Sequence, residues 1–301
     1  MRIVIDTDPG VDDMVAILAA LAEPGFDIAG ITTVGGNVSL AATTRNALRI
    51  LALAERDDVP VYKGAESPLD LSARHVHGED GLGGCDWPDA SFPARETAAL
   101  EFLGGLRTRY TLACLGPITN AAALLRERPD AAAFIERIVL MGGGFGTHSF
   151  EALHGVVHSH GNVVDDAEFN IHADPEAARV VFASGIPVTV MPLDVSHQTL
   201  VSRERLAALE GLVGREVAPV LDRYGAYSRT RWGHHSGPLH DPNVLANIAD
   251  DSLHGGTRGV VTVSSDGATA LRESPNGPHT VMTRVDAERY LDWVWERLAR
   301  L

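Results

Sequence analysis

Residues 2–13 read RIVIDTDPGVDD, and this stretch decides the fold. The apolar run at residues 3–5 is typical of a buried strand, and Pro9-Gly10 predict a turn after it. Apolar residues recur with helical spacing from Met14 to Leu21, which predicts a helix that begins at Asp12-Asp13. A strand, a turn and a helix in this order indicate the first unit of an α/β sheet.

Four aspartates, Asp6, Asp8, Asp12 and Asp13, lie within this stretch. Alternation about Thr7 would point Asp6 and Asp8 toward one face. Carboxylates gathered at the end of a first strand repel one another unless a cation or protons neutralise them. In open α/β sheets this is also the end where ligands bind. Helix capping explains Asp12 or Asp13 but not the other two, so the pattern favours a metal or catalytic site.

Composition limits the class of protein. The 301 residues, 45% of them hydrophobic, suffice for one large α/β domain or two small ones. A net charge of −15 disfavours nucleic-acid binding, which needs a basic face. No apolar run reaches the roughly 18–20 residues of a membrane span, and the start is too short and too acidic to be expected to act as a signal peptide. With Cys85 and Cys114 alone, no disulfide framework is implied. We expect a cytoplasmic protein with no nucleic-acid or membrane partner.

Strand-like and helical runs alternate through the first two-thirds of the chain. This alternation predicts βαβ units, and therefore an α/β fold with an open, mainly parallel, Rossmann-like sheet flanked by helices. We expect a single domain over residues 1–301. Expected strands are 2–6, 27–34, 59–62, 110–115, 136–141, 187–192, 259–263, 268–272 and 279–284; expected helices are 12–22, 39–55, 95–107, 118–128, 174–184, 203–212, 214–230 and 286–300.

Polar residues gather where the predicted strands end, which in a parallel sheet is one rim. Each alone has an ordinary explanation as a turn residue or helix cap, but their shared placement favours an active site there. Two long loops, 63–94 and 142–170, carry further candidates, since such loops are usually functional or mobile. The residues concerned are Gly35-Gly36-Asn37, His75, His77, Leu115 through Asn120, Met141 through Gly144, Asn162, Glu168-Phe169-Asn170 and His240-Asp241-Pro242.

With these motifs the chain resembles the inosine–uridine nucleoside hydrolase family. The aspartate-rich stretch 6–13 is the most specific of them. The motifs come in family order and cover nearly the whole chain. The others are Thr32 through Asn37, Thr44-Arg45-Asn46-Ala47, His75 through Gly78, Gly116 through Asn120, Val139 through Gly144, Ala167 through Asn170, Asp174-Pro175-Glu176-Ala177 and His240-Asp241-Pro242.

The resemblance implies a calcium-dependent N-ribohydrolase that cleaves ribonucleosides to free base and ribose. Asp8, Asp13 and Asp241 would bind the calcium ion through carboxylates, and Leu115 through its backbone carbonyl. This donor set suits a hard cation that takes six to eight oxygen ligands. The family usually has a threonine or a similar residue in place of Leu115. Because the family uses the carbonyl alone, this departure leaves the ligand set intact.

The resemblance also implies a role for each remaining candidate. Asp8 would act as general base on a calcium-bound water, with inversion at the sugar, and His240 would protonate the leaving base. His77, and secondarily His75, would lie near the base. The substrate-binding candidates are Asp12, Asn37, Asn162, Glu168 and Asn170 at the ribose hydroxyls, together with His77, Met141, Tyr227 and Trp232.

Several properties stay open at this point. Tyr227 and Trp232 suit base stacking and core packing equally. The loop between Gly144 and Asn162 is longer than in most relatives, and its four histidines suggest a mobile lid or, less readily, a second metal site. Base preference is not predicted, and a role in nucleoside salvage and a homodimer or homotetramer are expected by analogy alone.

Two other classes of protein compete with this reading. A phosphatase of the haloacid dehalogenase type also has Asp-x-Asp after its first strand. It would need a lysine near phosphate, yet lysines are rare here, Lys63 being one. A non-catalytic ribonucleoside-binding protein would need no general base. Release of ribose separates a hydrolase from both alternatives.

Overall fold

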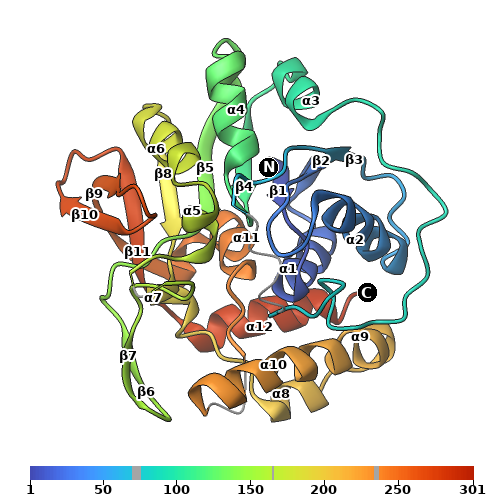
Figure 1. Cartoon of the computed structure of the whole chain (residues 1–301). Helices are drawn as coiled ribbons and strands as arrows, with labels where there is room; N and C mark the ends of the chain where they lie inside the picture. Colours follow the sequence, from blue (N-terminus) through green and yellow to red (C-terminus); the bar gives the residue numbers. More distant parts are fainter. Residues whose placement is uncertain (70–75, 165, 234–236) are drawn as a thin grey trace.

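The computed structural model describes residues 1–69, 76–164, 166–233 and 237–301. A nine-stranded sheet forms its centre, in the order β10-β9-β11-β8-β5-β4-β1-β2-β3 (Figure 1). The strands from β11 to β3 in this order pair in parallel, whereas β9 pairs antiparallel with β11 and β10. The mainly parallel sheet is as predicted. The strands are β1 Arg2–Thr7, β2 Asp27–Thr33, β3 Val61–Lys63, β4 Tyr110–Cys114, β5 Ile135–Met141, β8 Val188–Met191, β9 His254–Val263, β10 Thr269–Glu273 and β11 His279–Val285.

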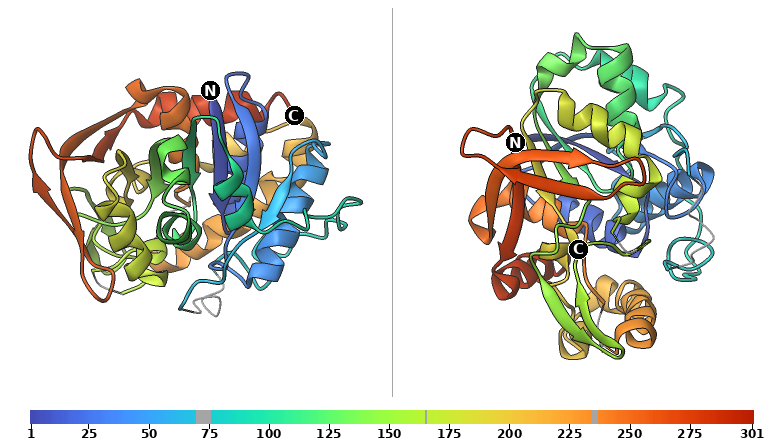
Figure 2. Two further views of the ribbon diagram at one scale, coloured as in Figure 1. Left: turned by 90° about the horizontal axis from the view of Figure 1, so that it is seen from above. Right: turned by 60° about the vertical axis from the view of Figure 1, so that its left-hand side comes forward.

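Helices cover both faces of the sheet (Figures 1 and 2). In β1 the side chains of Ile3 and Ile5 enter one apolar core and Val4 enters the other, because successive side chains of a strand point to opposite faces. The first core lies against α1 Val11–Leu21, α2 Leu40–Leu53, α10 Ala218–Trp232, α11 Pro242–Ala249 and α12 Ala287–Leu298. The second lies against α3 Ala99–Gly105, α4 Thr119–Glu127 and α6 Pro175–Ala183.

The centre of the sheet is the point that positions the site. β1 pairs in parallel with β2 on one side and with β4 on the other, so their carboxyl ends share one rim. The helices that follow β1 and β4, α1 and α4, lie on opposite faces of the sheet. Loops that leave neighbouring strands toward opposite faces form a crevice between them, where ligands of open α/β sheets bind.

Several segments differ from the sequence-based prediction. The expected loop 142–170 contains a hairpin, β6 Ser149–Ala152 and β7 Gly155–His158, which projects from the body in Figure 1. The helix expected at 95–107 begins at Ala99, because the Arg95 N–H donates to the Val61 carbonyl beside β3 (2.8 Å). Unpredicted or shortened helices are α5 Phe169–Ala173, α7 Leu193–Ser196, α8 Arg203–Ala207, α9 Gly211–Glu216 and α11, with 3-10 turns at Ala131–Phe134 and Asp251–Leu253.

A search of the described residues finds no helix with the length and apolar character needed to span a membrane.

Candidate active site

Four buried carboxylates meet at the carboxyl end of β1. Asp8 follows the strand, Asp12 and Asp13 lie in the first turn of α1, and Asp241 directly precedes α11. All four residues are at most 4% exposed. Oxygen atoms of Asp12, Asp13 and Asp241 lie within 4.8 Å of one another, close enough to share a metal ion. Asp8 is not one of these three, but Asn37 donates hydrogen bonds to both Asp8 and Asp13, and the charges of Asp13 and Asp12 raise the pKa of Asp8, so Asp8 borders the group.

The turn after β1 fixes Asp13 through both of its carboxylate oxygens. The Thr7 hydroxyl donates to Oδ1, and the Gly10 N–H donates to Oδ2 (2.9 Å). Gly10 is required in this turn, because a Cβ there would collide with the side chains of Asn37 and His77. Thr7 is a contact that the sequence analysis missed, since a threonine inside a strand carries no signal of its own.

Asp8 is fixed by the loops that follow the neighbouring strands. The Asn37 N–H donates to Asp8 Oδ2 (2.7 Å), and the Asn37 side-chain amide donates to the Asp8 carbonyl (3.1 Å). The carboxylate lies against Gly36 after β2 and Gly116 after β4, where any Cβ would collide with it. The motifs at the ends of the two strands beside β1 therefore fix the position of the Asp8 carboxylate.

Asp6 does not belong to the carboxylate group, although the sequence analysis gathered it with Asp8, Asp12 and Asp13. Its Oδ1 accepts hydrogen bonds from the Thr32 hydroxyl (2.5 Å) and the Asn120 amide (2.8 Å), while its Oδ2 is buried with no hydrogen-bond partner. Burial raises the pKa of Asp6 to about 6, although the hydrogen bonds from Thr32 and Asn120 lower it. Asp6 ties β1 to β2 and α4, which is a structural role.

The charges within the carboxylate group repel one another. Burial, followed by the charges of neighbouring aspartates, raises the pKa of Asp8 and of Asp241 well above the ordinary value. Burial and the charge of Asp12 likewise raise the pKa of Asp13. Within the described residues no arginine or lysine forms an ion pair with any of the four. Such a site is completed by protons or by a bound cation.

Two histidines border the carboxylates. His77 Nδ1 accepts the Val11 N–H (3.1 Å) and lies 3.8 Å from Asp12 Oδ1; burial lowers the pKa of His77 to about 4. Because Nδ1 is an acceptor, the neutral ring carries its proton on Nε2. Burial also lowers the pKa of His240, on which the charges of Asp12 and His77 act. His240 Nδ1 lies 2.7 Å from the Ser196 hydroxyl, a contact the sequence analysis missed.

A second group of predicted residues lies where β4 and β5 end. The Asn170 amide donates to the carbonyls of Leu115 (2.7 Å) and Met141 (3.2 Å). Glu168 accepts the N–H groups of Asn170 and Gly143, both at 2.9 Å. Burial raises the pKa of Glu168 to about 7. Since Leu115 precedes Gly116, which contacts Asp8, the two groups adjoin across β4.

Four further predicted residues either make only a local contact or lie, in whole or in their side chains, outside the described part of the structure. The Asn162 side chain accepts the Phe169 N–H (2.9 Å) and so shapes the segment that leads to Glu168. Tyr227 and Trp232 lie in α10, but their side chains fall outside the described part of the structure, as does the whole of His75. The choice between base stacking and core packing therefore stays open.

The hairpin β6–β7 is rooted firmly beside the site. Buried Asp194 accepts the N–H groups of Phe145 (2.8 Å) and His148 (3.2 Å) and the hydroxyl of Thr147 (2.8 Å). Its tip reaches Gly233, directly after α10, since a Cβ on Gly233 would collide with Leu153. Among the described residues the hairpin histidines form no metal-competent group, which leaves the second metal site unsupported. Asp194 carried no sequence signal, because its partners lie some fifty positions away.

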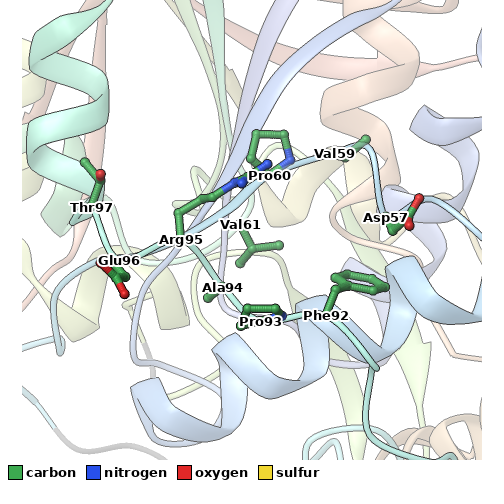
Figure 3. A pocket seen from close by; sticks show the side chains of 10 residues that line it. All are labelled: Asp57, Val59, Pro60, Val61, Phe92, Pro93, Ala94, Arg95, Glu96 and Thr97. Atoms are coloured by element: carbon green, nitrogen blue, oxygen red, sulfur yellow. The ribbon is translucent and has the colours of Figure 1, made fainter.

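A surface cavity of about 390 Å³ lies away from this rim, beside the start of β3 (Figure 3). Apolar side chains such as Phe92, Pro60 and Val61 line it, with Arg95 and Glu96 among them. None of the predicted site residues contributes to it. The candidate active site is thus identified by its chemistry, not by this hollow.

Comparison with known proteins agrees with this geometry. The family model described as inosine-uridine preferring nucleoside hydrolase matches residues 3–292. The pyrimidine-specific ribonucleoside hydrolase RihA of Salmonella arizonae is 38% identical, over 99% of this chain and 98% of that protein. A solved purine-preferring ribonucleoside hydrolase from Gardnerella vaginalis has a TM-score of 0.88 at 32% identity, covering 100% of this chain and 98% of the other. A plant nucleoside hydrolase, PpNRh1, has a TM-score of 0.87 at 31% identity, covering 100% and 99%.

The match spans both the carboxylate group at the end of β1 and the Glu168–Asn170 group across β4. The chain belongs to the inosine-uridine preferring nucleoside hydrolase family of ribonucleoside N-ribohydrolases.

Proposed function

We propose that this N-ribohydrolase cleaves the N-glycosidic bond with Asp8 as general base and His240 as general acid, at a calcium site formed by Asp8, Asp13, Asp241 and the Leu115 carbonyl. The observation that carries the proposal is the set of buried, mutually repelling carboxylates without an arginine or lysine partner in the described chain. Acids in this state favour a bound cation, because it removes the repulsion that burial strengthens.

The donor set fits calcium. Carboxylate and carbonyl oxygens are the ligands of hard cations, and the set contains no sulfur ligand. When bound, calcium would supply positive charge that lowers the pKa of a water molecule and would orient two ribose hydroxyls. The Leu115 carbonyl accepts the Asn170 amide, so this ligand comes with a neighbour that fixes its direction.

Asp8 suits the role of base because its orientation is preset. Asn37 holds one carboxylate oxygen, and Gly36 and Gly116 leave no space for the group to turn away. A water beside the other oxygen would lose its proton to Asp8 as it attacks the anomeric carbon. Attack from the face opposite the base inverts the configuration of that carbon.

On the opposite side of the sugar, His240 and His77 would act on the leaving base. The transition state places positive charge on the ribose ring and negative charge on the departing base. The ribose hydroxyls would be held, and the sugar kept puckered toward the oxocarbenium ion, by Asp12, Asn37, Asn162, Glu168 and Asn170, with Met141 packing beside them. His240 would donate a proton to the base, and His77 Nε2–H would donate a hydrogen bond to it.

Base preference and cellular role follow less directly. The relatives include both a pyrimidine-specific and a purine-preferring enzyme, so the chain's base is unassigned. If the side chains of Tyr227 and Trp232 reach the site from α10, they would stack on the base. We further propose that the protein acts in nucleoside salvage in the cytoplasm as a homodimer or homotetramer. Light scattering on the purified protein tests the oligomeric state.

A reducing-sugar assay on inosine, adenosine, guanosine, uridine and cytidine tests the function. Ribose release from at least one nucleoside, abolished by a calcium chelator and restored by added calcium, is the expected result. Absence of ribose from all five would contradict the hydrolase assignment. Full activity after chelation would leave the hydrolase standing but remove calcium from the account.

A further inference from the structure

Ser196 is a buried residue that the proposed mechanism does not use. It ends α7, the short helix directly after β8, and it is fully buried. Its backbone N–H bonds to the Pro192 carbonyl within the helix, but its hydroxyl bonds outside the helix, to His240 Nδ1 at 2.7 Å. A serine in a helix commonly turns its hydroxyl back to its own backbone, so this contact to a side chain from another element calls for an explanation.

Hydrogen bonds connect the two segments of the chain that carry Ser196 and His240. The Thr199 hydroxyl donates to the Leu239 carbonyl (3.2 Å), and the Leu239 N–H donates to the Thr199 carbonyl (3.2 Å). Buried Asn243 donates to the Leu239 carbonyl (2.8 Å) and to Thr199 Oγ1 (3.3 Å). The distance between Ser196 and His240 is therefore set by a rigid scaffold.

His240 is also confined by a neighbouring ring. His197 packs edge-on against it, with ring centroids 5.8 Å apart and an angle of 63° between the planes. Buried Ser159, at the base of the hairpin, holds His197 through Nδ1 at 2.8 Å. A hydrogen bond at Nδ1 and an edge contact together restrict rotation of the His240 ring.

We propose that Ser196 is a positioning residue that holds His240 by Nδ1, so that Nε2 faces the departing base. The inference rests on the proposed function, since it concerns the acid of that reaction. The Nδ1–H of the charged ring donates to Ser196 Oγ. As the C1′–N bond breaks, its electron pair passes to the base, and the Nε2 proton forms the new N–H bond on the base. The ring is left neutral, with its Nδ1–H still donating to the serine.

The test compares two leaving groups. A natural base departs poorly without a proton, whereas p-nitrophenolate needs none. Ser196→Ala should lower kcat for the preferred nucleoside about 10- to 100-fold, as expected for loss of one hydrogen bond to a charged group. Its KM for the nucleoside and its rate on p-nitrophenyl riboside should stay near wild type. Ser196→Thr keeps the hydroxyl and should restore nucleoside turnover.

Two controls isolate the effect. Ser184→Ala removes a serine hydroxyl with a hydrogen bond of the same length, 2.7 Å to the Val181 carbonyl, at the end of α6. The rates of Ser184→Ala on the nucleoside and on p-nitrophenyl riboside should both stay near wild type. Because Ser196 acts through His240, adding Ser196→Ala to His240→Ala should cause no further loss on nucleosides.

Four outcomes are decisive. Wild-type kcat of Ser196→Ala on nucleosides, or equal losses on both substrates, would overturn the positioning role. An additive loss in the double variant would also overturn it. A wild-type protein that cleaves neither substrate would instead refute the proposed function, and the inference with it. Thermal unfolding of every variant, with Ser196→Thr as reference, separates misfolding from mispositioning.

Discussion

The Asn37 N–H donates to Asp8 Oδ2 over 2.7 Å, while the side-chain amide of the same residue donates to Asp13 Oδ2 over 3.2 Å. A single residue after β2 thus orients the carboxylate proposed as base and a carboxylate proposed as metal ligand. The end of β2 contributes to the chemistry of β1 because the two strands are parallel neighbours.

Asp8→Asn tests the base. The amide keeps the shape and one acceptor for Asn37 but cannot take a proton from water. We expect kcat to fall about 10²–10⁴-fold, the usual cost of losing a general base, with a much smaller rise in KM. Asp6→Asn is the matched control two residues away, and it should keep kcat close to wild type because the Asp6 carboxylate accepts hydrogen bonds from Thr32 and Asn120 and lies outside the carboxylate group. Steady-state kinetics that found similar losses in both variants would remove the special role of Asp8.

Asp241→Asn tests the calcium site through stability. Calcium at about 100 times its Kd should stabilise the wild type by about 2.7 kcal/mol, because it binds the folded state. Without calcium the variant should be at least as stable as the wild type, since one repelling charge is gone. With calcium its melting temperature should not rise. Asp250→Asn, at a carboxylate that is 42% exposed and paired with Arg289, should keep the wild-type calcium response. The same rise in Asp241→Asn would contradict the ligand assignment.

Gly116→Ala tests whether the strand-end glycines position Asp8. The added Cβ would meet the Asp8 carboxylate, so that group must shift. Activity should fall at least tenfold, in line with the sensitivity of catalysis to small displacements. Gly105→Ala at the end of α3, where a Cβ has open space, should leave activity unchanged and stabilise the protein by up to about 1 kcal/mol. Normal activity of Gly116→Ala would show that Asp8 needs no such restraint.

His254 predicts a pH dependence of stability. Its Nε2 lies 3.1 Å from Asn243 Oδ1, and burial lowers its pKa from 6.5 to about 4. The unfolded chain therefore binds a proton at higher pH than the folded protein. The stability that the neutral His254 ring contributes is complete above pH 6.5 and is lost as the pH falls toward 4. Between pH 7.5 and 5 the wild type should lose about 2 kcal/mol more unfolding free energy than His254→Gln. Urea titrations at both pH values check this, and parallel losses would contradict it.

The sequence predicted the central sheet and the rim because these depend on local patterns. The apolar run at residues 3–5 directly predicts a buried strand, and the aspartates after it predict that carboxylates crowd at its carboxyl end. Asp6 was grouped with the other aspartates because it is close to them in sequence, whereas its hydrogen-bond partners, Thr32 and Asn120, come from β2 and α4. The partners of each carboxylate therefore depend on the elements that pack beside its strand as well as on the direction of its side chain.

The parts that escaped prediction depend on contacts distant in sequence. The hairpin at 149–158 has a weak apolar alternation, and Asp194 fixes its root from 46–49 positions away. The contact of Ser196 with His240 spans 44 positions. Neither residue belongs to a motif with a chemical signature, so only the folded chain brings them to the site.

Proton NMR of the reaction as it proceeds tests the central claim most directly. If Asp8 activates a water that attacks opposite the base, a β-ribonucleoside must give free base and α-ribofuranose as the first sugar, before the anomers equilibrate. The wild type should produce this anomer in phosphate-free buffer, and Asp8→Asn should produce it at least about 100-fold more slowly. Initial β-ribofuranose, or equal rates for the two proteins, would contradict direct attack by a water that Asp8 activates.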